Sequence, residues 1–226
     1  MAAAASSLTS VFFDLDGTLT DPRPGIVRSI QHALKSLNRT VLPEEELLWC
    51  IGPPLRESFA ELLAIDGADH SELIEAAVDR YRDYFSETGL YENAVYPGVE
   101  ACLARLQAEG LELAVVTSKP HVYAERVLEH FDLRRFFGHV FGAELSGERS
   151  AKTELVAHAL RTLTCRADAA CMIGDRAQDM RGAVANDVRA LGVLYGYGSA
   201  SELEGAGATA LAADVPEVAA WVLSLR

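Results

Sequence analysis

Two carboxylates separated by a single residue, Asp14 and Asp16, follow an apolar run in the stretch Val11-Phe12-Phe13-Asp14-Leu15-Asp16-Gly17-Thr18. Because residues i and i+2 of a strand point to the same side, both carboxylates are expected to leave the end of a buried strand toward one point. Two bare carboxylates held this close repel each other, and a divalent cation or a division of roles would relieve the conflict. Gly17 lets the chain turn sharply beyond them. The alternative is a strand followed by an ordinary acidic turn, because so short a motif also occurs by chance.

Polar residues follow later apolar runs in the same way. Thr117 and Ser118 end the run at 111–117, and Asp175 follows the run at 170–174. If these runs are parallel strands, their carboxyl ends share one edge of a sheet, where open α/β sheets bind their ligands. A helix that begins at Pro120 would add an anion site at its N-terminus. The alternative for Thr117 is that it only caps this helix.

Four charged residues could serve an anionic ligand that binds together with a metal ion. Lys152 falls in the first turn of a predicted helix, where the helix dipole disfavours a cation by roughly 0.3–1 kcal/mol. A phosphate dianion held at the strand ends would explain its position, whereas most lysines are simply solvated. Asp175 and Asp179 are hard oxygen ligands of the kind that Mg²⁺ prefers, although Asp175 could instead cap the next helix. Arg56, after a glycine-proline loop, contacts either the substrate or a surface acid.

The elements that must position these residues alternate between strand and helix. Apolar runs predict strands over 11–13, 111–117, 139–142, 170–174 and 190–194, and helical periodicity predicts helices between them. Only helices are expected between 21 and 90, over 26–37, 43–48, 56–64 and 71–86. We therefore predict an α/β protein with a doubly wound parallel sheet, formed by residues 1–20 and 91–226, and an inserted all-helical domain at 21–90.

Composition limits the classes of partner. Half of the 226 residues are hydrophobic and the net charge is −13, which argues against a nucleic-acid polymer or an anionic membrane as the main partner. The four cysteines form no C-x-x-C pair and no disulfide-dense spacing, which fits a reducing cytoplasm. No apolar run approaches membrane-spanning length, and the Ala/Ser-rich start lacks the features of a signal peptide. We expect a cytoplasmic protein, either a monomer or a homodimer.

Taken together, D-x-D-G-T after a strand, a strand that ends in Thr-Ser, a lysine at a helix start and G-D-x-x-x-D resemble the haloacid dehalogenase-like (HAD) superfamily. All four motifs occur in the order of that family and cover residues 11 to about 190. The helical segment resembles its α-helical cap, and the core would be Rossmann-like. The stretches at 51–56, 116–120 and 195–198 resemble the branch that holds phosphoglycolate phosphatases and 5′-nucleotidase-like phosphatases.

The resemblance implies a role for each matching residue. Asp14 would be the nucleophile that forms an aspartyl-phosphate, and Asp16 would protonate the leaving oxygen and then deprotonate the attacking water. Thr117 and Lys152 would hold the phosphoryl oxygens. The expected Mg²⁺ ligands are Asp14, Asp16 through its carbonyl group, and Asp175, with Asp179 as a ligand or just beyond. Residues expected to bind substrate are Gly17, Ser118 and Arg56.

The resemblance also ranks the possible functions. Asp16 argues against a dehalogenase, because the dehalogenases of the superfamily lack this acid. Ala177 and Gln178 depart from the basic or histidine residues expected before Asp179. A Mg²⁺-dependent phosphatase acting on a small phosphorylated metabolite is the leading hypothesis, and the substrate is left open. A sugar-phosphate mutase resembling β-phosphoglucomutase is the first alternative, and a non-catalytic metal-binding regulatory protein is the second.

Overall fold

The computed structural model describes residues 7–63 and 71–226. The chain divides into two compact units, one formed by Met1–Asp21 and Val95–Arg226 and the other by Pro22–Ala94. Our predicted domains were 1–20 with 91–226, and 21–90. The role of the second unit as a cap remains a prediction.

A six-stranded sheet forms the centre of the first unit, with the strand order β5-β4-β1-β6-β7-β8. All of its printed pairings are parallel. Its strands are β1 (Ser10–Phe13), β4 (Glu112–Pro120), β5 (His139–Ala143), β6 (Ala170–Gly174), β7 (Arg189–Val193) and β8 (Ala210–Ala212). Every residue of the central strands β1 and β6 is buried, which is why these strands appear as continuous apolar runs rather than as an alternation.

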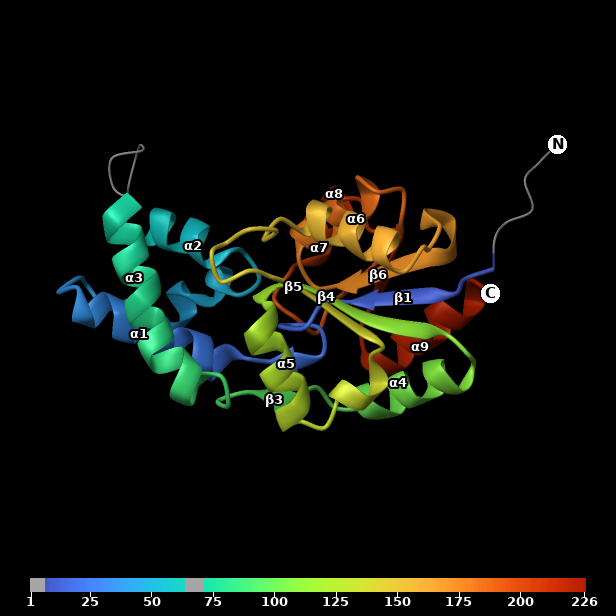
Figure 1. Ribbon diagram of the computed structural model, residues 1–226, viewed down its shortest axis with the longest axis horizontal. Helices are drawn as coiled ribbons and strands as arrows, with labels where there is room; N and C mark the ends of the chain where they lie inside the picture. The colour runs from blue at the N-terminus through green and yellow to red at the C-terminus, as the bar shows by residue number, and fades with distance from the viewer. Residues whose placement is uncertain (1–6, 64–70) are drawn as a thin grey trace. The chain divides into compact units, whose positions relative to one another are not determined.

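Helices cover both faces of this sheet (Figure 1). One layer contains α6 (Lys152–Thr162), α7 (Ala177–Val184) and α8 (Ala200–Gly205). The other contains α4 (Val99–Ala108), α5 (His121–His130) and α9 (Val215–Ser224). Phe12 and Met172 of the sheet pack with Leu155 of α6 and Met180 of α7 in one core cluster. The predicted α/β doubly wound class is therefore confirmed.

Several strands differ from the sequence prediction. β4 continues three residues beyond Thr117 to Pro120, with an irregular register against β5 in this part. β8 is not among the strands predicted from the sequence, because alanine has a low strand propensity. The two-residue strands β2 (Thr20–Asp21) and β3 (Ala94–Val95) form a separate sheet and are too short for any periodicity to reveal.

Among its described residues, the second unit has the α-helices α1 (Arg23–Ser36), α2 (Leu55–Leu62) and α3 (Ser71–Tyr84), and α3 continues into a π-helical turn, Phe85–Gly89. The rings of Tyr81 and Phe85 stack with centroids 5.0 Å apart, and Phe59 meets Tyr81 edge to face at 6.2 Å. The helix predicted over 43–48 is instead two short 3₁₀ turns, Glu44–Glu46 and Leu48–Cys50. The last residue of the helix predicted over 56–64 lies outside the described residues.

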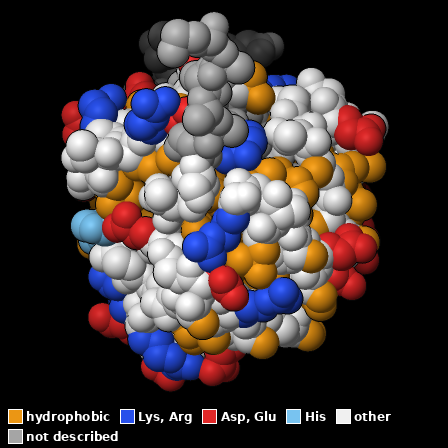
Figure 2. Space-filling model, turned by 90° about the vertical axis from the view of Figure 1, so that its right-hand side faces the viewer, with side chains coloured by type: hydrophobic (Ala, Val, Ile, Leu, Met, Phe, Trp, Pro, Cys, Tyr) orange, Lys and Arg blue, Asp and Glu red, His pale blue; other side chains and the backbone are white. Residues whose placement is uncertain are grey.

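The surface and the helix lengths bear on the partner classes considered above. Within 7–63 and 71–226, no helix is both long and apolar enough to cross a membrane. Figure 2 shows Lys and Arg side chains interspersed with acidic and hydrophobic ones on the face that it displays. Among the described residues drawn there, no continuous basic area is seen.

Candidate active site

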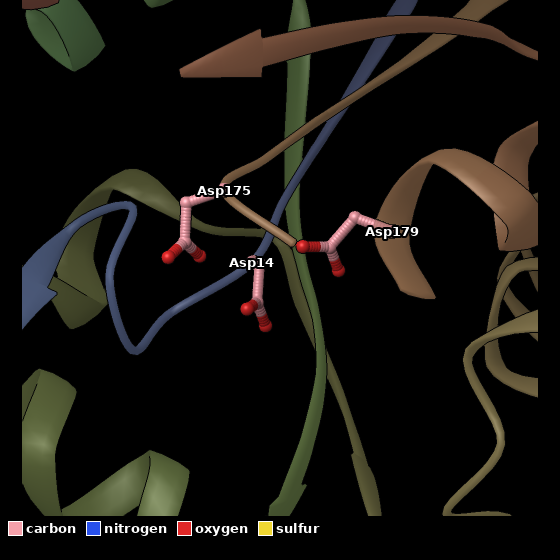
Figure 3. Close-up of side chains that lie close together, drawn as sticks. All are labelled: Asp14, Asp175 and Asp179. Carbon is pink, nitrogen blue, oxygen red and sulfur yellow. The ribbon is translucent and has the colours of Figure 1, made fainter. Parts of the chain in front are cut away.

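Three buried aspartates gather at the carboxyl ends of two neighbouring strands (Figure 3). Asp14 follows β1, Asp175 follows β6, and Asp179 lies in the first turn of α7. Because β1 and β6 pair in register, with Phe13 opposite Ile173, the two strands end side by side. One carboxylate oxygen of each aspartate lies within 4.8 Å of those of the other two. The fold thus brings Asp14, Asp175 and Asp179 together, whereas the carboxylate of Asp16 is not a member of this group.

Burial governs the acidity of this cluster. Burial raises the pKa of Asp175 well above its usual range, and the charges of Asp179 and Asp14 raise it further. Burial also raises the pKa of Asp179 to about 6, although the nearby Lys152 ammonium acts in the opposite direction. Three hard oxygen donors at this spacing fit a divalent cation, whose charge would hold them all in the ionised form. The donor set is thus compatible with the predicted metal.

The start of α7 fixes the Asp179 carboxylate. Arg176 is the N-cap of this helix, and its backbone N–H donates to Asp179 Oδ2 at 3.1 Å. The other oxygen, Oδ1, lies 2.7 Å from Lys152 Nζ. The alternative in which Asp175 caps α7 is therefore not what the structure has. Its carboxylate belongs to the cluster instead.

Lys152 is buried beside two of the aspartates. It is the first residue of α6, and its side chain is 3% exposed. Its ammonium group lies 2.8 Å from Asp14 Oδ1 and 2.9 Å from the Val116 carbonyl oxygen, in addition to the contact with Asp179. Burial alone would lower the pKa of Lys152, but the charges of Asp14 and Asp179 raise it overall. Lys152 is thus not the solvated surface lysine that was the alternative.

Asp16 has a cationic partner that the sequence analysis missed. Lys119, near the end of β4, forms a buried ion pair with Asp16 Oδ2. Burial raises the pKa of Asp16, while Lys119 lowers it. The second oxygen, Asp16 Oδ1, is buried and accepts no hydrogen bond from the described residues. The i, i+2 spacing of Thr117 and Lys119 could have indicated this lysine, because residues two apart in a regular strand point to the same side.

Thr117 and Ser118 lie within the extended end of β4. Thr117 is buried, and its hydroxyl oxygen accepts a hydrogen bond from the Lys119 backbone N–H at 3.3 Å. Helix α5 has Pro120 as its N-cap and no side-chain cap, so the capping alternative for Thr117 does not hold. Ser118 is partly buried and donates its hydroxyl to the Ser150 carbonyl oxygen at 3.0 Å.

Asp175 is enclosed by two chain segments. Thr18 Oγ1 donates to its Oδ1 at 3.4 Å, and the Tyr197 backbone N–H donates to its Oδ2 at 2.8 Å. Gly17 has a φ of +86°, and a Cβ there would lie 2.2 Å from Asp175 Oδ2. Gly17 is therefore required for the backbone to pass the carboxylate. Whether it also contacts substrate, as predicted, remains a prediction.

Two residues predicted to belong to the site, Arg56 and Asp16, are not in the three-aspartate cluster. Arg56, on α2 of the second unit, binds Glu75 of α3 through Nε at 2.5 Å and Nη2 at 2.8 Å. This bidentate ion pair matches the surface-acid alternative, and substrate binding by Arg56 remains a prediction. The Asp16 carboxylate lies outside the three-aspartate cluster. Its predicted metal contact through the backbone carbonyl also remains a prediction.

Comparison with known proteins identifies the family. Residues 11–193 match the family described as haloacid dehalogenase-like hydrolase. The chain belongs to this family. A 5′-nucleotidase of Pseudomonas aeruginosa is 43% identical over 215 residues, which cover 95% of this chain and 96% of that protein. A crystal structure of a predicted phosphatase from Clostridium acetobutylicum has a TM-score of 0.93 and 41% identity, covering 97% of this chain and all of that one.

A third relative carries a different description. The tyrosine-protein kinase PtkA of Mycobacterium tuberculosis is 37% identical over 195 residues, which cover 86% of this chain but 65% of that protein. Because about a third of that relative has no counterpart in this match, its activity is not carried over. The predicted family and enzyme class are confirmed at this level, and the residue roles, the metal and the substrate remain predictions.

Proposed function

We propose that this chain is a Mg²⁺-dependent phosphatase that hydrolyses a small phosphomonoester through an aspartyl-phosphate on Asp14. The observation that carries the proposal is the setting of Asp14. Its carboxylate lies at a strand end, 2.8 Å from a buried ammonium group and within 4.8 Å of two further carboxylates. A carboxylate nucleophile beside an ammonium group and two possible metal ligands suits attack on a phosphate ester, because the negative charge of the ester must be offset.

Asp14 and Asp16 divide the chemistry of the first step. An Asp14 oxygen forms a bond to phosphorus while the bond from phosphorus to the leaving oxygen breaks. Asp16 gives its proton to that oxygen, so the alcohol leaves uncharged. Burial raises the pKa of Asp16, which favours the protonated form needed for this step. Its Oδ1, buried and without a described partner, is the oxygen available to carry the proton.

The second step returns the enzyme to its starting state. Asp16, now a carboxylate, takes a proton from water, and the water oxygen attacks phosphorus while the bond to Asp14 breaks. Inorganic phosphate is released, and Asp16 is again protonated. The ion pair with Lys119 stabilises the carboxylate form of Asp16 between the two steps. One residue thus serves as acid and then as base.

Lys152 and Thr117 are proposed to hold the phosphoryl oxygens, with Ser118 and Gly17 beside them. The Lys152 ammonium group pairs with Asp14 and Asp179, and that of Lys119 pairs with Asp16, while Asp175 is a further carboxylate beside Asp14 and Asp179. A divalent cation would offset the remaining negative charge. Mg²⁺ held by Asp14, Asp175 and the Asp16 carbonyl, with Asp179 as a ligand or just beyond, would supply positive charge to the phosphoryl group in transfer.

A nucleoside monophosphate is the first substrate to test. The Pseudomonas aeruginosa protein described as a 5′-nucleotidase matches nearly the whole chain at 43% identity. Phosphoglycolate comes second, on the resemblance of the 51–56, 116–120 and 195–198 stretches to that branch. A sugar-phosphate mutase would keep the same two aspartates and differ in what the second unit retains, so it stays the alternative.

The test is phosphate release across a panel of phosphomonoesters, with Mg²⁺ and with a chelator. Asp14→Asn is the control, because it keeps the shape of the side chain and removes the nucleophile. We expect release that depends on Mg²⁺, favours one substrate and vanishes in the variant. Equal release from wild type and Asp14→Asn would refute the proposed nucleophile. Interconversion of sugar phosphates without net phosphate release would move the assignment to a mutase.

A further inference from the structure

A four-residue loop at 195–198, directly after β7 and Leu194, encloses the metal-type carboxylate of Asp175. Its Tyr197 backbone N–H donates to Asp175 Oδ2 at 2.8 Å. A Cβ on Gly196 would lie 2.4 Å from Asp175 Cβ, and one on Gly198 would lie 2.0 Å from the Asp175 carbonyl oxygen. The loop therefore passes Asp175 so closely that two of its four positions have room only for glycine. The loop is thus in close contact with Asp175 and donates a hydrogen bond to its carboxylate.

The same loop reaches the segment through which the chain leaves the first unit. Tyr197 donates its hydroxyl to the carboxylate of Asp21, the last residue of that unit before the helical one. Tyr195 donates its hydroxyl to the Thr18 carbonyl oxygen at 3.1 Å. One short loop thus holds Asp175 from its backbone and Asp21 from a side chain.

The returning segment is tied to the loop as well. The ring of Tyr96, two residues after the end of the helical unit, meets the ring of Tyr195 edge to face with centroids 5.0 Å apart. The Tyr96 backbone N–H donates to the Leu19 carbonyl oxygen at 3.1 Å. The segments that leave and re-enter the first unit, at Asp21 and at Tyr96, therefore both contact the loop that holds Asp175. All of these contacting residues belong to the first unit.

We propose that Tyr197 is a positioning residue that couples the Asp175 carboxylate to the outgoing passage at Asp21. The proposal rests on the proposed function, in which Asp175 is a metal ligand. Mg²⁺ binding at Asp175 would fix the 195–198 loop, and the Tyr197 hydroxyl would then hold Asp21 in one arrangement. Coupling between two such sites is reciprocal. Loss of the Tyr197–Asp21 hydrogen bond therefore weakens Mg²⁺ binding by the same factor by which bound Mg²⁺ stabilises that hydrogen bond.

The first measurement is amide hydrogen exchange at residues 18–21, with and without Mg²⁺ alone, in the full chain. In the wild type we expect Mg²⁺ to slow exchange there by about 5-fold or more, the lower end of typical coupling between sites. Tyr197→Phe keeps the ring and the backbone N–H and removes the hydroxyl, so this Mg²⁺-dependent protection should be lost. Tyr123→Phe, a buried tyrosine on α5, is the matched control and should keep it.

The second measurement is the Mg²⁺ dissociation constant by calorimetry for wild type, Tyr197→Phe, Asp21→Ala and the double variant. Each single variant should raise the constant by about 5-fold, and the double variant no further, because both remove the same contact. Additive effects, or unchanged Mg²⁺-dependent protection in Tyr197→Phe, would overturn the coupling. Thermal unfolding of each variant separates this from a general loss of stability, which would lower protection equally with and without Mg²⁺.

The experiments give different results if the Tyr197 coupling is wrong and if the proposed function is wrong. If the wild type binds Mg²⁺ and releases phosphate while exchange at residues 18–21 is unchanged by the metal, only the coupling through Tyr197 is wrong. If the wild type neither binds Mg²⁺ nor releases phosphate, the proposed function is wrong, and the coupling through Tyr197, which rests on it, is wrong as well.

Discussion

Lys152 carries a positive charge into a place that is almost closed to solvent, and only its acidic neighbours make this favourable. Its side chain is 3% exposed, and Asp14 and Asp179 lie within 2.8 Å of its ammonium group. A buried charge without a partner is strongly unfavourable, so each member of this triad depends on the others. The odd position of the residue in the sequence, a lysine at a helix start, thus follows from its contacts.

Replacing Lys152 with Met should therefore destabilise the protein and abolish phosphate release. Loss of one partner leaves buried carboxylates uncompensated, and we expect the free energy of unfolding to fall by about 3–5 kcal/mol. Urea denaturation measures the fall. Lys35→Met is the matched control, because Lys35 is exposed on α1, and we expect a change within about 0.5 kcal/mol. A Lys152→Met variant with wild-type stability and turnover would contradict the role given to this ammonium group.

Asp179 gives the protein a pH dependence with a defined sign. Its pKa is about 6 in the folded protein against an ordinary value of 3.8, so the folded state binds more protons between these two values. Stability supplied by this group is therefore present below pH 4 and declines as the pH rises toward 6. In metal-free buffer, the unfolding free energy of the wild type relative to Asp179→Asn should fall across this window. Urea titrations at several pH values measure the difference, and a rise with pH would reverse the assigned shift.

At the scale of elements, one turn and one loop confine the Asp175 carboxylate, and their glycines make this possible. Gly17 has a φ of +86°, and an added Cβ there meets Asp175 Oδ2 at 2.2 Å. Gly110, after α4, has a similar φ of +78°, but an added Cβ meets nothing within 4 Å. The pair separates the cost of the backbone conformation from the cost of a clash inside the site.

Gly110→Ala should lower the unfolding free energy by about 1–2 kcal/mol, the cost of a left-handed conformation for a residue with a Cβ, and leave turnover unchanged. Gly17→Ala adds the collision with Asp175 to that cost, so it should be the less stable variant and lose both Mg²⁺ binding and phosphate release. Thermal unfolding, calorimetry with Mg²⁺ and the phosphate assay measure the three quantities. Equal behaviour of the two variants would mean that the turn does not depend on the close approach to Asp175.

The strands and the 195–198 loop show which parts of the site could be predicted from the sequence and which could not. Asp14 and Asp16 could be placed at a strand end because a buried parallel strand is an unbroken apolar run, and register between neighbouring strands then brought Asp175 to the same edge. The Lys119–Asp16 pair was missed because β4 was expected to end at Thr117, before the lysine. The 195–198 loop comes some twenty residues after Asp175 in the sequence. No periodicity in the sequence indicates that it packs against that carboxylate.

At the scale of the whole molecule, the acidic cluster belongs to only one of two compact units. All three clustered aspartates lie in the unit formed by Met1–Asp21 and Val95–Arg226, and the helical unit Pro22–Ala94 has its own aromatic core around Phe59, Tyr81 and Phe85. A ligand stabilises only the folded region that binds it. A metal held by the aspartates should therefore act on the first unit, and unfolding of the whole chain need not follow a two-state transition.

Mg²⁺ at about 100 times its dissociation constant should stabilise the first unit by about 2.7 kcal/mol and leave local opening in the helical unit unchanged. Hydrogen exchange resolved by residue measures this, because core amides of β1 and β6 and those of α1 and α3 are followed separately. Asp14→Asn and Asp175→Asn should each reduce the effect on the first unit, since each removes one charge from the cluster. Equal Mg²⁺-dependent protection of α1 and α3 would mean that the two units unfold as one, and unchanged protection of β1 and β6 would exclude a metal bound at the three aspartates.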